Sequence, residues 1–158
     1  MFAGAVLDYI AKNHIKNVIM AATWNSYVES DSTEAQILKT FQAVLSAGAR
    51  VYFLKGVPLQ AGDIRQLTAA AIWKNDGLEA TGITRGQLAA QYQGWDDTLA
   101  RLKKTGATVL DPDGFFLSDK GLYGFVKNDQ VLYFDSQHLT VEGALLLAPL
   151  FEPIFHTN

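Results

Sequence analysis

The sequence has 158 residues, of which 49% are hydrophobic and 18% are charged, and its formal net charge is −3 at pH 7. These values are typical of one globular domain, and the weak negative charge argues against a surface that binds nucleic acid. The sequence contains no cysteine, which excludes a disulfide framework and a thiolate metal site. We therefore expect a single soluble domain over residues 1–158, with no segment apolar and long enough to span a bilayer.

The first half of the chain predicts helices and strands in alternation. Apolar residues at helical spacing predict a helix over residues 3–13, and the apolar run at 18–22 predicts a strand buried on both faces. A capping-box pattern at Asp31 and Glu34 then begins a helix that ends at Gly48. The segment RVYFL at 50–54 predicts the next strand, which a Gly-Val-Pro sequence ends.

The second half continues the alternation. Helices are expected at 64–72, at 84–105 after a capping box, and from Val141 onward, and extended segments at 107–110 and 131–134. Thr140 is expected to cap the last of these helices, which should pack Leu145, Leu146 and Phe151 inward. The intervening stretch 111–130 is rich in glycine and aspartate and predicts a loop.

Strands that alternate with helices predict βαβ units, a parallel sheet, and helices on both of its faces. The expected fold class is therefore a three-layer α/β/α sandwich with a flavodoxin-like sheet. Sheets of this class have about five strands or more, which is more than this pattern supplies. We therefore expect the sheet to be truncated at its N-terminal strands.

The most informative local pattern is Asp135-Ser-Gln-His138, at the end of a loop that follows a predicted strand. Functional residues of open α/β sheets gather beyond the carboxyl ends of strands. A carboxylate at this spacing can accept a hydrogen bond from the imidazole Nδ1, which leaves Nε2 free as a base. The alternative is that Asp135 caps a turn and His138 is a partly exposed loop residue. For an isolated D-x-x-H pattern, this alternative is the commoner case.

Another polar loop follows the first predicted strand. The side-chain amide of Asn25 there is a candidate oxyanion donor, although without further context an ordinary loop asparagine is the better explanation. Trp24 beside it is typical of a packing residue. The serines of this loop lie in neither a Gly-x-Ser-x-Gly nor a Gly-Asp-Ser sequence, so none is nominated as the nucleophile (Ser26, Ser30 and Ser32).

The two remaining histidines give little support to a metal site. His14 precedes a predicted strand and His156 lies in the carboxyl-terminal tail, and both are expected at the surface. No cluster of His, Asp and Glu accompanies His138 in the sequence. We expect neither a metal nor an organic cofactor.

Three stretches together carry a resemblance to a known family. They are IKNVIMAATWNSY at 15–27, LSAGARVYFLKGVP at 45–58 and VLYFDSQHLTVEGA at 131–144. They resemble SGNH-type hydrolase domains, and most closely the SGNH domain fused to acyltransferase-3 membrane proteins that O-acetylate O-antigen and other cell-surface polysaccharides. The third stretch is the most specific, because His-Leu-Thr and Gly143-Ala144 accompany the D-x-x-H pair. The resemblance covers nearly the whole chain.

The resemblance implies a Ser-His-Asp triad in which His138 is the base and Asp135 orients it. It also implies a polysaccharide acceptor and a membrane-embedded acyltransferase domain, in the same or a partner chain. The implied location is the periplasmic side of the inner membrane.

The sequence departs from the family pattern at two places. No Gly-Asp-Ser nucleophile block occurs, because the single Gly-Asp pair, Gly62-Asp63, is followed by isoleucine. Since the predicted helix at 3–13 resembles the one before the family's third strand, the nucleophile block is expected upstream of this chain. At the family's oxyanion block, direct alignment places Trp24 rather than Asn25 at the asparagine.

Two functions therefore remain open. One is the SGNH portion of an O-acyltransferase, which transfers acetyl groups to or from polysaccharide hydroxyls and is inactive as the isolated chain. The other is a degenerate, non-catalytic SGNH-like module that binds glycan or a partner protein. A nucleotide-binding flavodoxin-like domain is disfavoured because the sequence has no glycine-rich phosphate loop.

Overall fold

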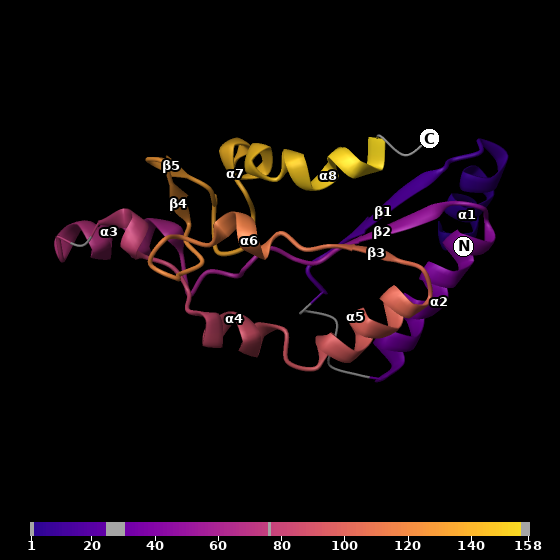
Figure 1. Cartoon of the computed structure of the whole chain (residues 1–158), viewed down its shortest axis with the longest axis horizontal. Helices are drawn as coiled ribbons and strands as arrows, with labels where there is room; N and C mark the ends of the chain where they lie inside the picture. The colour runs from indigo at the N-terminus through magenta and orange to yellow at the C-terminus, as the bar shows by residue number, and fades with distance from the viewer. Residues whose placement is uncertain (1, 25–30, 76, 156–158) are drawn as a thin grey trace. The chain divides into compact units, whose positions relative to one another are not determined.

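The computed structural model describes residues 2–24, 31–75 and 77–155 (Figure 1). Backbone contacts divide the chain into two compact units, Met1–Gly56 with Gly94–Leu110, and Val57–Gln93 with Asp111–Asn158. The chain thus passes from one unit to the other three times.

The first unit contains a parallel sheet of three strands in the order β1-β2-β3: β1 (Asn17–Ala21), β2 (Arg50–Leu54) and β3 (Thr108–Leu110). Val18 lies opposite Val51, and Phe53 lies opposite Val109. The parallel sheet and the α/β class predicted from the alternating pattern are confirmed.

The three strands differ in burial. Val51, Tyr52 and Phe53 are all buried, so β2 is covered on both faces. In the described part of the chain β1 pairs only with β2, and Ile19 is 42% exposed. The prediction that β1 is buried on both faces is therefore wrong, because the apolar composition of a strand does not show how completely other elements cover its two faces.

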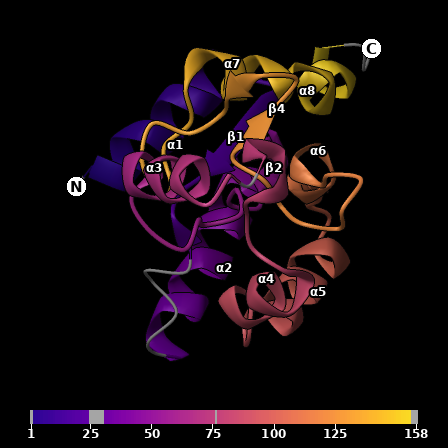
Figure 2. The ribbon, with the colours of Figure 1, turned by 90° about the vertical axis from the view of Figure 1, so that its left-hand side faces the viewer.

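Within its described residues this unit contains the α-helices α1 (Phe2–Lys12), α2 (Asp31–Ser46) and α5 (Trp95–Lys104). Helices α2 and α5 lie side by side (Figures 1 and 2), where Arg101 forms an ion pair with Glu34 at 3.0 Å. Ile37 and Phe41, which belong to the apolar stripe of α2, are buried. The predicted cap at Asp31 falls outside the described side chains.

The second unit is built from short elements. They are α3 (Ile64–Trp73), η2 (Leu78–Ala80), α4 (Arg85–Gln91), α6 (Asp113–Phe116), β4 (Val126–Lys127), β5 (Gln130–Val131), α7 (Val141–Leu146) and α8 (Ala148–Phe155). The capping box predicted at Thr84 and Gln87 is confirmed at the start of α4.

The helix predicted over 84–105 is two helices, so that prediction is wrong. Gly94 adopts a left-handed conformation with φ 88°, after α4 has ended and before α5 begins. Leu88 in α4 and Trp95 and Leu102 in α5 are all buried. The apolar pattern therefore continues across the break and does not reveal it. Glycine populates this backbone region without a steric penalty, so one helix can end and the next begin at this position.

The loop predicted over 111–130 contains the short helix α6 and part of an antiparallel hairpin. Strands β4 and β5 pair in antiparallel orientation and are connected by a two-residue turn. The turn residues Asn128 and Asp129 have φ angles of 51° and 60°. Two central residues with positive φ are typical of a type I′ turn, which asparagine and aspartate tolerate. The polar composition concealed these short elements.

Helix α7 begins as predicted, with the Thr140 hydroxyl accepting from the backbone N–H of Gly143 at 3.1 Å. Leu145 was expected to point inward but is 67% exposed, whereas Leu147 and Ile154 are buried. The short helices α7 and α8 meet at Leu147, which is the C-cap of α7. Their apolar faces therefore do not follow one continuous helical stripe.

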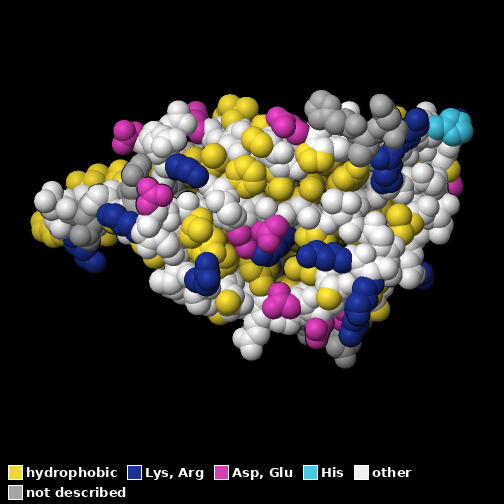
Figure 3. Space-filling model, in the orientation of Figure 1, with side chains coloured by type: hydrophobic (Ala, Val, Ile, Leu, Met, Phe, Trp, Pro, Cys, Tyr) yellow, Lys and Arg dark blue, Asp and Glu magenta, His cyan; other side chains and the backbone are white. Residues whose placement is uncertain are grey.

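Hydrophobic side chains also reach the surface around α3, at the left of Figure 3. The most exposed of them are Trp73 at 91% and Ile72 at 66%.

Within the described ranges, none of the helices has the length and apolar character needed to cross a bilayer.

Candidate active site

Asp135 organises the loop 135–138 through both carboxylate oxygens. Its Oδ1 accepts hydrogen bonds from the backbone N–H groups of Gln137 and His138, at 2.9 and 2.8 Å. Its Oδ2 lies 2.7 Å from Nδ1 of His138. The predicted hydrogen bond between Asp135 and His138 is confirmed, and so is the alternative expectation that Asp135 caps a turn.

The pairing determines what the imidazole can do. An ionised carboxylate only accepts hydrogen bonds, so the Nδ1 of neutral His138 carries the proton and Nε2 is an acceptor. The side chain of His138 is 68% exposed and that of Asp135 is 39% exposed. The loop therefore presents an oriented base to solvent.

The hydrogen bonds keep Asp135 ionised. Those from the Gln137 backbone, the His138 side chain and the His138 backbone lower the pKa of the Asp135 carboxyl from 3.8 to about 2. Burial, with the Asp113 charge as a smaller cause, raises the pKa of the Tyr133 phenol well above its usual range. At neutral pH the loop thus combines a carboxylate with a neutral phenol at its base.

The loop is held in place by the segment that follows β2 in the sequence. The backbone N–H of Gln60 donates to the carbonyl of Ser136 at 2.8 Å, and the hydroxyl of Tyr133 donates to the carbonyl of Pro58 at 2.9 Å. Gln91 in turn fixes Leu59 by hydrogen bonds in both directions, at 3.0 and 2.7 Å. These contacts join segments far apart in the chain, which is why the sequence pattern did not reveal Gln60, Tyr133 or Gln91.

The residues after His138 have structural reasons for their identity. The backbone N–H of Thr140 donates to the carbonyl of Leu132 at 3.0 Å, which closes the loop. A Cβ on Gly143 would overlap that same carbonyl oxygen, so only glycine fits there. The threonine of His-Leu-Thr and the glycine of Gly-Ala therefore hold the end of the loop close to the first turn of α7.

The other predicted site residues have different outcomes. Asn25, Ser26 and Ser30 lie outside the described residues, as do His156 and the side chain of Ser32. Trp24 is a packing residue as expected, since its Nε1 donates to the Leu54 carbonyl at 2.8 Å and its ring stacks on Phe53. His14 is exposed, as predicted.

Two further observations limit the chemistry of the described residues. No hydroxyl group in the described ranges donates to Nε2 of His138. No three His, Asp or Glu residues come together there as a set that could hold a metal ion. The loop itself can accept a proton and keep the imidazole oriented, but the described residues do not pair it with a nucleophile.

A family model for the SGNH domain fused to AT3 domains matches residues 1–153. The chain belongs to this family. The predicted resemblance is confirmed, and the Asp135–His138 loop lies within the matched part of the SGNH domain. A comparison of the sequence with curated proteins found no match.

Among solved structures, the SGNH domain is similar to the periplasmic domain of a lipopolysaccharide acetyltransferase from Salmonella ser. Paratyphi A. The TM-score is 0.67 at 14% sequence identity, and the similarity covers 96% of this chain and 60% of that chain. The SGNH domain described here thus spans about 60% of the length of that solved domain. At this identity the likeness establishes the α/β fold.

Proposed function

We propose that this SGNH domain is part of an O-acyltransferase in which His138 is the general base and Asp135 orients it. The observation that carries the proposal is the 2.7 Å contact between Asp135 Oδ2 and His138 Nδ1, in a chain whose family is fused to AT3 acyltransferase domains. The exposure of His138 leaves Nε2 accessible to a reacting hydroxyl.

In this mechanism the nucleophile is a serine from a Gly-Asp-Ser block outside residues 1–158. Nε2 of His138 takes the serine proton while the serine oxygen attacks the acyl donor, and a serine ester forms as the donor's leaving group departs with that proton. A hydroxyl of the acceptor then gives its proton to Nε2 and attacks the serine ester. The acyl group passes to the acceptor, and the serine oxygen leaves with the proton from Nε2, which regenerates the serine and the neutral imidazole.

Asp135 supports each proton transfer. Because its pKa is held at about 2, the carboxylate is ionised whenever the imidazole becomes positively charged, and it stabilises that charge. The domain uses no metal or organic cofactor in this scheme. An oxyanion donor, for which Asn25 is the sequence candidate, would complete the site.

We further propose a cell-surface polysaccharide, such as O-antigen, as the acceptor. The acyl group would come from a membrane-embedded acyltransferase domain of the same or a partner chain, and the domain would act at the periplasmic face of the inner membrane. The AT3 fusion in the family description supports the partner. The lipopolysaccharide acetyltransferase of similar fold, which is itself a periplasmic domain, supports the acceptor class and the location.

The test is the acetate bound to surface polysaccharide in cells that express the full reading frame containing this chain. Replacing His138 by alanine should lower the ester-bound acetate by roughly 10²–10⁴-fold, the usual contribution of a general base. His14→Ala is the matched control, because His14 is also an exposed histidine but lies in the turn after α1. Full acetylation with His138→Ala would instead favour the non-catalytic module that binds glycan or a partner.

A further inference from the structure

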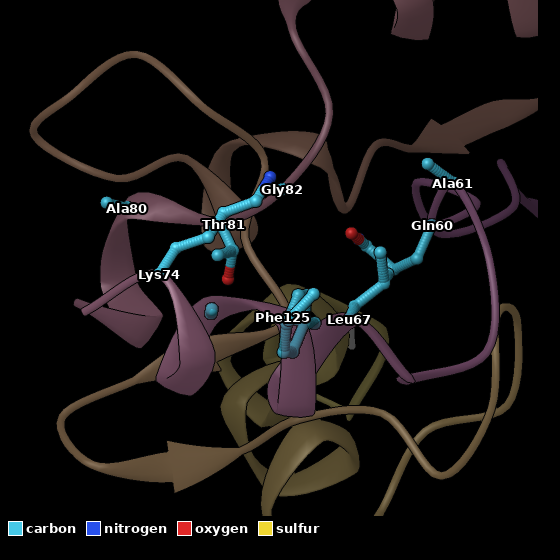
Figure 4. A pocket seen from close by; sticks show the side chains of 10 residues that line it. Gln60, Ala61, Leu67, Lys74, Ala80, Thr81, Gly82 and Phe125 are labelled. Atoms are coloured by element: carbon cyan, nitrogen blue, oxygen red, sulfur yellow. The ribbon is translucent and has the colours of Figure 1, made fainter. Parts of the chain in front are cut away.

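A hollow of about 230 Å³ lies within the second unit, between the segment after Pro58, helix α3 and residues 80–82. Its polar lining includes Gln60, Lys74 and Thr81, and its apolar lining includes Leu67, Ala71 and Phe125 (Figure 4). None of these residues takes part in the proton transfers at His138. The role of the hollow is therefore a separate question.

Gln60 is the unusual member of this lining, because it is only 6% exposed and incompletely hydrogen-bonded. Its Nε2 lies 3.5 Å from the carbonyl of Pro58 and 3.4 Å from that of Tyr123. Two acceptors around Nε2 fix the orientation of the amide, and the amide oxygen then faces the hollow (Figure 4). Within the described ranges Oε1 has no hydrogen-bond donor.

A buried amide oxygen without a donor costs free energy, so such a group in a folded protein calls for an explanation. A bound molecule that donates a hydrogen bond supplies one. The Thr81 hydroxyl already donates to the carbonyl of Leu78, so toward the hollow it too acts as an acceptor. The hollow therefore offers two acceptors, and the Lys74 ammonium is its cationic donor.

This arrangement selects among ligand classes. A carboxylate or a fully ionised phosphate ester could pair with Lys74 but has no proton for the two acceptors. An acyl chain could form no hydrogen bond with any of these three groups. A sugar ring carries hydroxyl groups that donate and accept, and its C–H face can contact Leu67, Ala71 and Phe125.

The size narrows the choice further. Pockets for drug-sized ligands have volumes of roughly 300–1,000 Å³, so a hollow of about 230 Å³ suits a single ring. We infer that this hollow binds one sugar residue of the acceptor, with the amide oxygen of Gln60 accepting a hydrogen bond from a sugar hydroxyl. This inference rests on the proposed polysaccharide acceptor.

Gln60 also connects the hollow to the candidate active site. Its backbone N–H donates to the carbonyl of Ser136, which stands between Asp135 and His138, at 2.8 Å. A sugar that orders the Gln60 side chain would thus act on the residue that anchors the catalytic loop. The side chain of Gln60 would thus bind the acceptor, while its backbone N–H holds the loop in position.

The test uses the ¹⁵N-labelled chain and methyl glycosides of hexoses, 6-deoxyhexoses and N-acetylhexosamines at millimolar concentrations. At least one glycoside should shift the signals of the Gln60 side-chain amide and of the Thr81 and Gly82 backbone. Ala70→Phe should weaken binding at least tenfold, because Ala70 lines the hollow yet is exposed enough to accept a larger side chain. Ala69→Phe, at an exposed position of α3 outside the lining, should bind as the unmodified chain does.

Three outcomes would overturn the inference: no shift with any glycoside, binding that Ala70→Phe leaves unchanged, or equal shifts with acetate or phosphate alone. His138→Ala separates this inference from the proposed function. Glycoside binding by the His138→Ala chain, together with full acetylation in His138→Ala cells, would refute the catalytic proposal and support the sugar site. Lost acetylation without any glycoside binding would refute the sugar site alone.

Discussion

Asp135 accepts three hydrogen bonds at the start of the loop, and only one of them comes from the imidazole of His138. The other two come from the backbone N–H groups of Gln137 and His138. The carboxylate therefore shapes the loop whatever the side chain at position 138. Substitutions of His138 should remove the base and leave the loop in place, whereas a substitution of Asp135 that removes its side-chain oxygens, such as Asp135→Ala, should affect both.

The pKa of Asp135 provides the first prediction. In a carboxyl-detected NMR titration its midpoint should lie at about 2, below the ordinary value of 3.8. His138→Ala should raise the midpoint but leave it below 3.8, because the backbone hydrogen bond of Gln137 is the largest cause of the shift. A midpoint at the ordinary value in the unmodified chain would contradict the hydrogen-bonded loop.

The same shift has a consequence for stability. A pKa that folding lowers contributes stability that is complete above the unfolded value and lost as the pH falls through the folded value. For Asp135 that window runs from pH about 4 down to about 2. Asp63, whose pKa the side chain of Arg65 also lowers to about 2, contributes in the same window. Urea unfolding between pH 5 and 2 should therefore show a shallower loss of stability in Asp63→Asn and Asp135→Asn than in the unmodified chain.

The second prediction concerns Asp135→Asn in the full-length protein. The asparagine oxygen can still accept from the backbone, but its amide group would face Nδ1 and favour the tautomer with the proton on Nε2. Acyl transfer should fall by roughly 10³–10⁴-fold, as expected when a base is held in the wrong tautomer. The ¹⁵N chemical shifts of His138 should report the change of tautomer, which a merely structural role of Asp135 would not produce.

The third prediction concerns Gly143, where a Cβ would overlap the carbonyl oxygen of Leu132. Gly143→Ala should lower the free energy of unfolding by about 1–3 kcal/mol, the usual cost of overpacking. Gly86→Ala is the matched control, since Gly86 also lies in the first turn of a helix and its nearest potential contact is 4.0 Å away. That control should be stabilising by roughly 0.5–1 kcal/mol, because alanine favours helix over glycine. If urea titrations gave the same change in the free energy of unfolding for Gly143→Ala and Gly86→Ala, the close approach at Gly143 would not be destabilising for alanine.

The fourth prediction concerns the chain of residues 1–158 on its own. Because the described residues bring no hydroxyl to Nε2 of His138, this chain should hydrolyse p-nitrophenyl acetate no faster than its His138→Ala variant. A burst of nitrophenol that a serine-reactive phosphonate abolishes would show that the chain contains its own nucleophile. The proposal of a serine outside residues 1–158 would then fail.

The sequence by itself determined the features that depend on neighbours a few residues apart. The strands β1, β2 and β3, the capping box at Thr84 and the cap at Thr140 all follow from local periodicity or from hydrogen bonds across three residues. The Asp135–His138 pair belongs to the same class, since a turn of this length brings the two side chains together. Such features depend on local backbone geometry, so the sequence pattern is sufficient to predict them.

Only the tertiary structure decided the features that join distant segments. The Tyr133 hydroxyl meets the Pro58 carbonyl 75 positions earlier in the chain, and Gln60 meets both Ser136 and Tyr123. The break at Gly94 and the exposure of Leu145 likewise depend on which apolar residues find partners elsewhere in the fold. Periodicity shows that a residue is apolar or polar, but its partner is fixed only when the whole chain packs, because those contacts depend on every intervening turn.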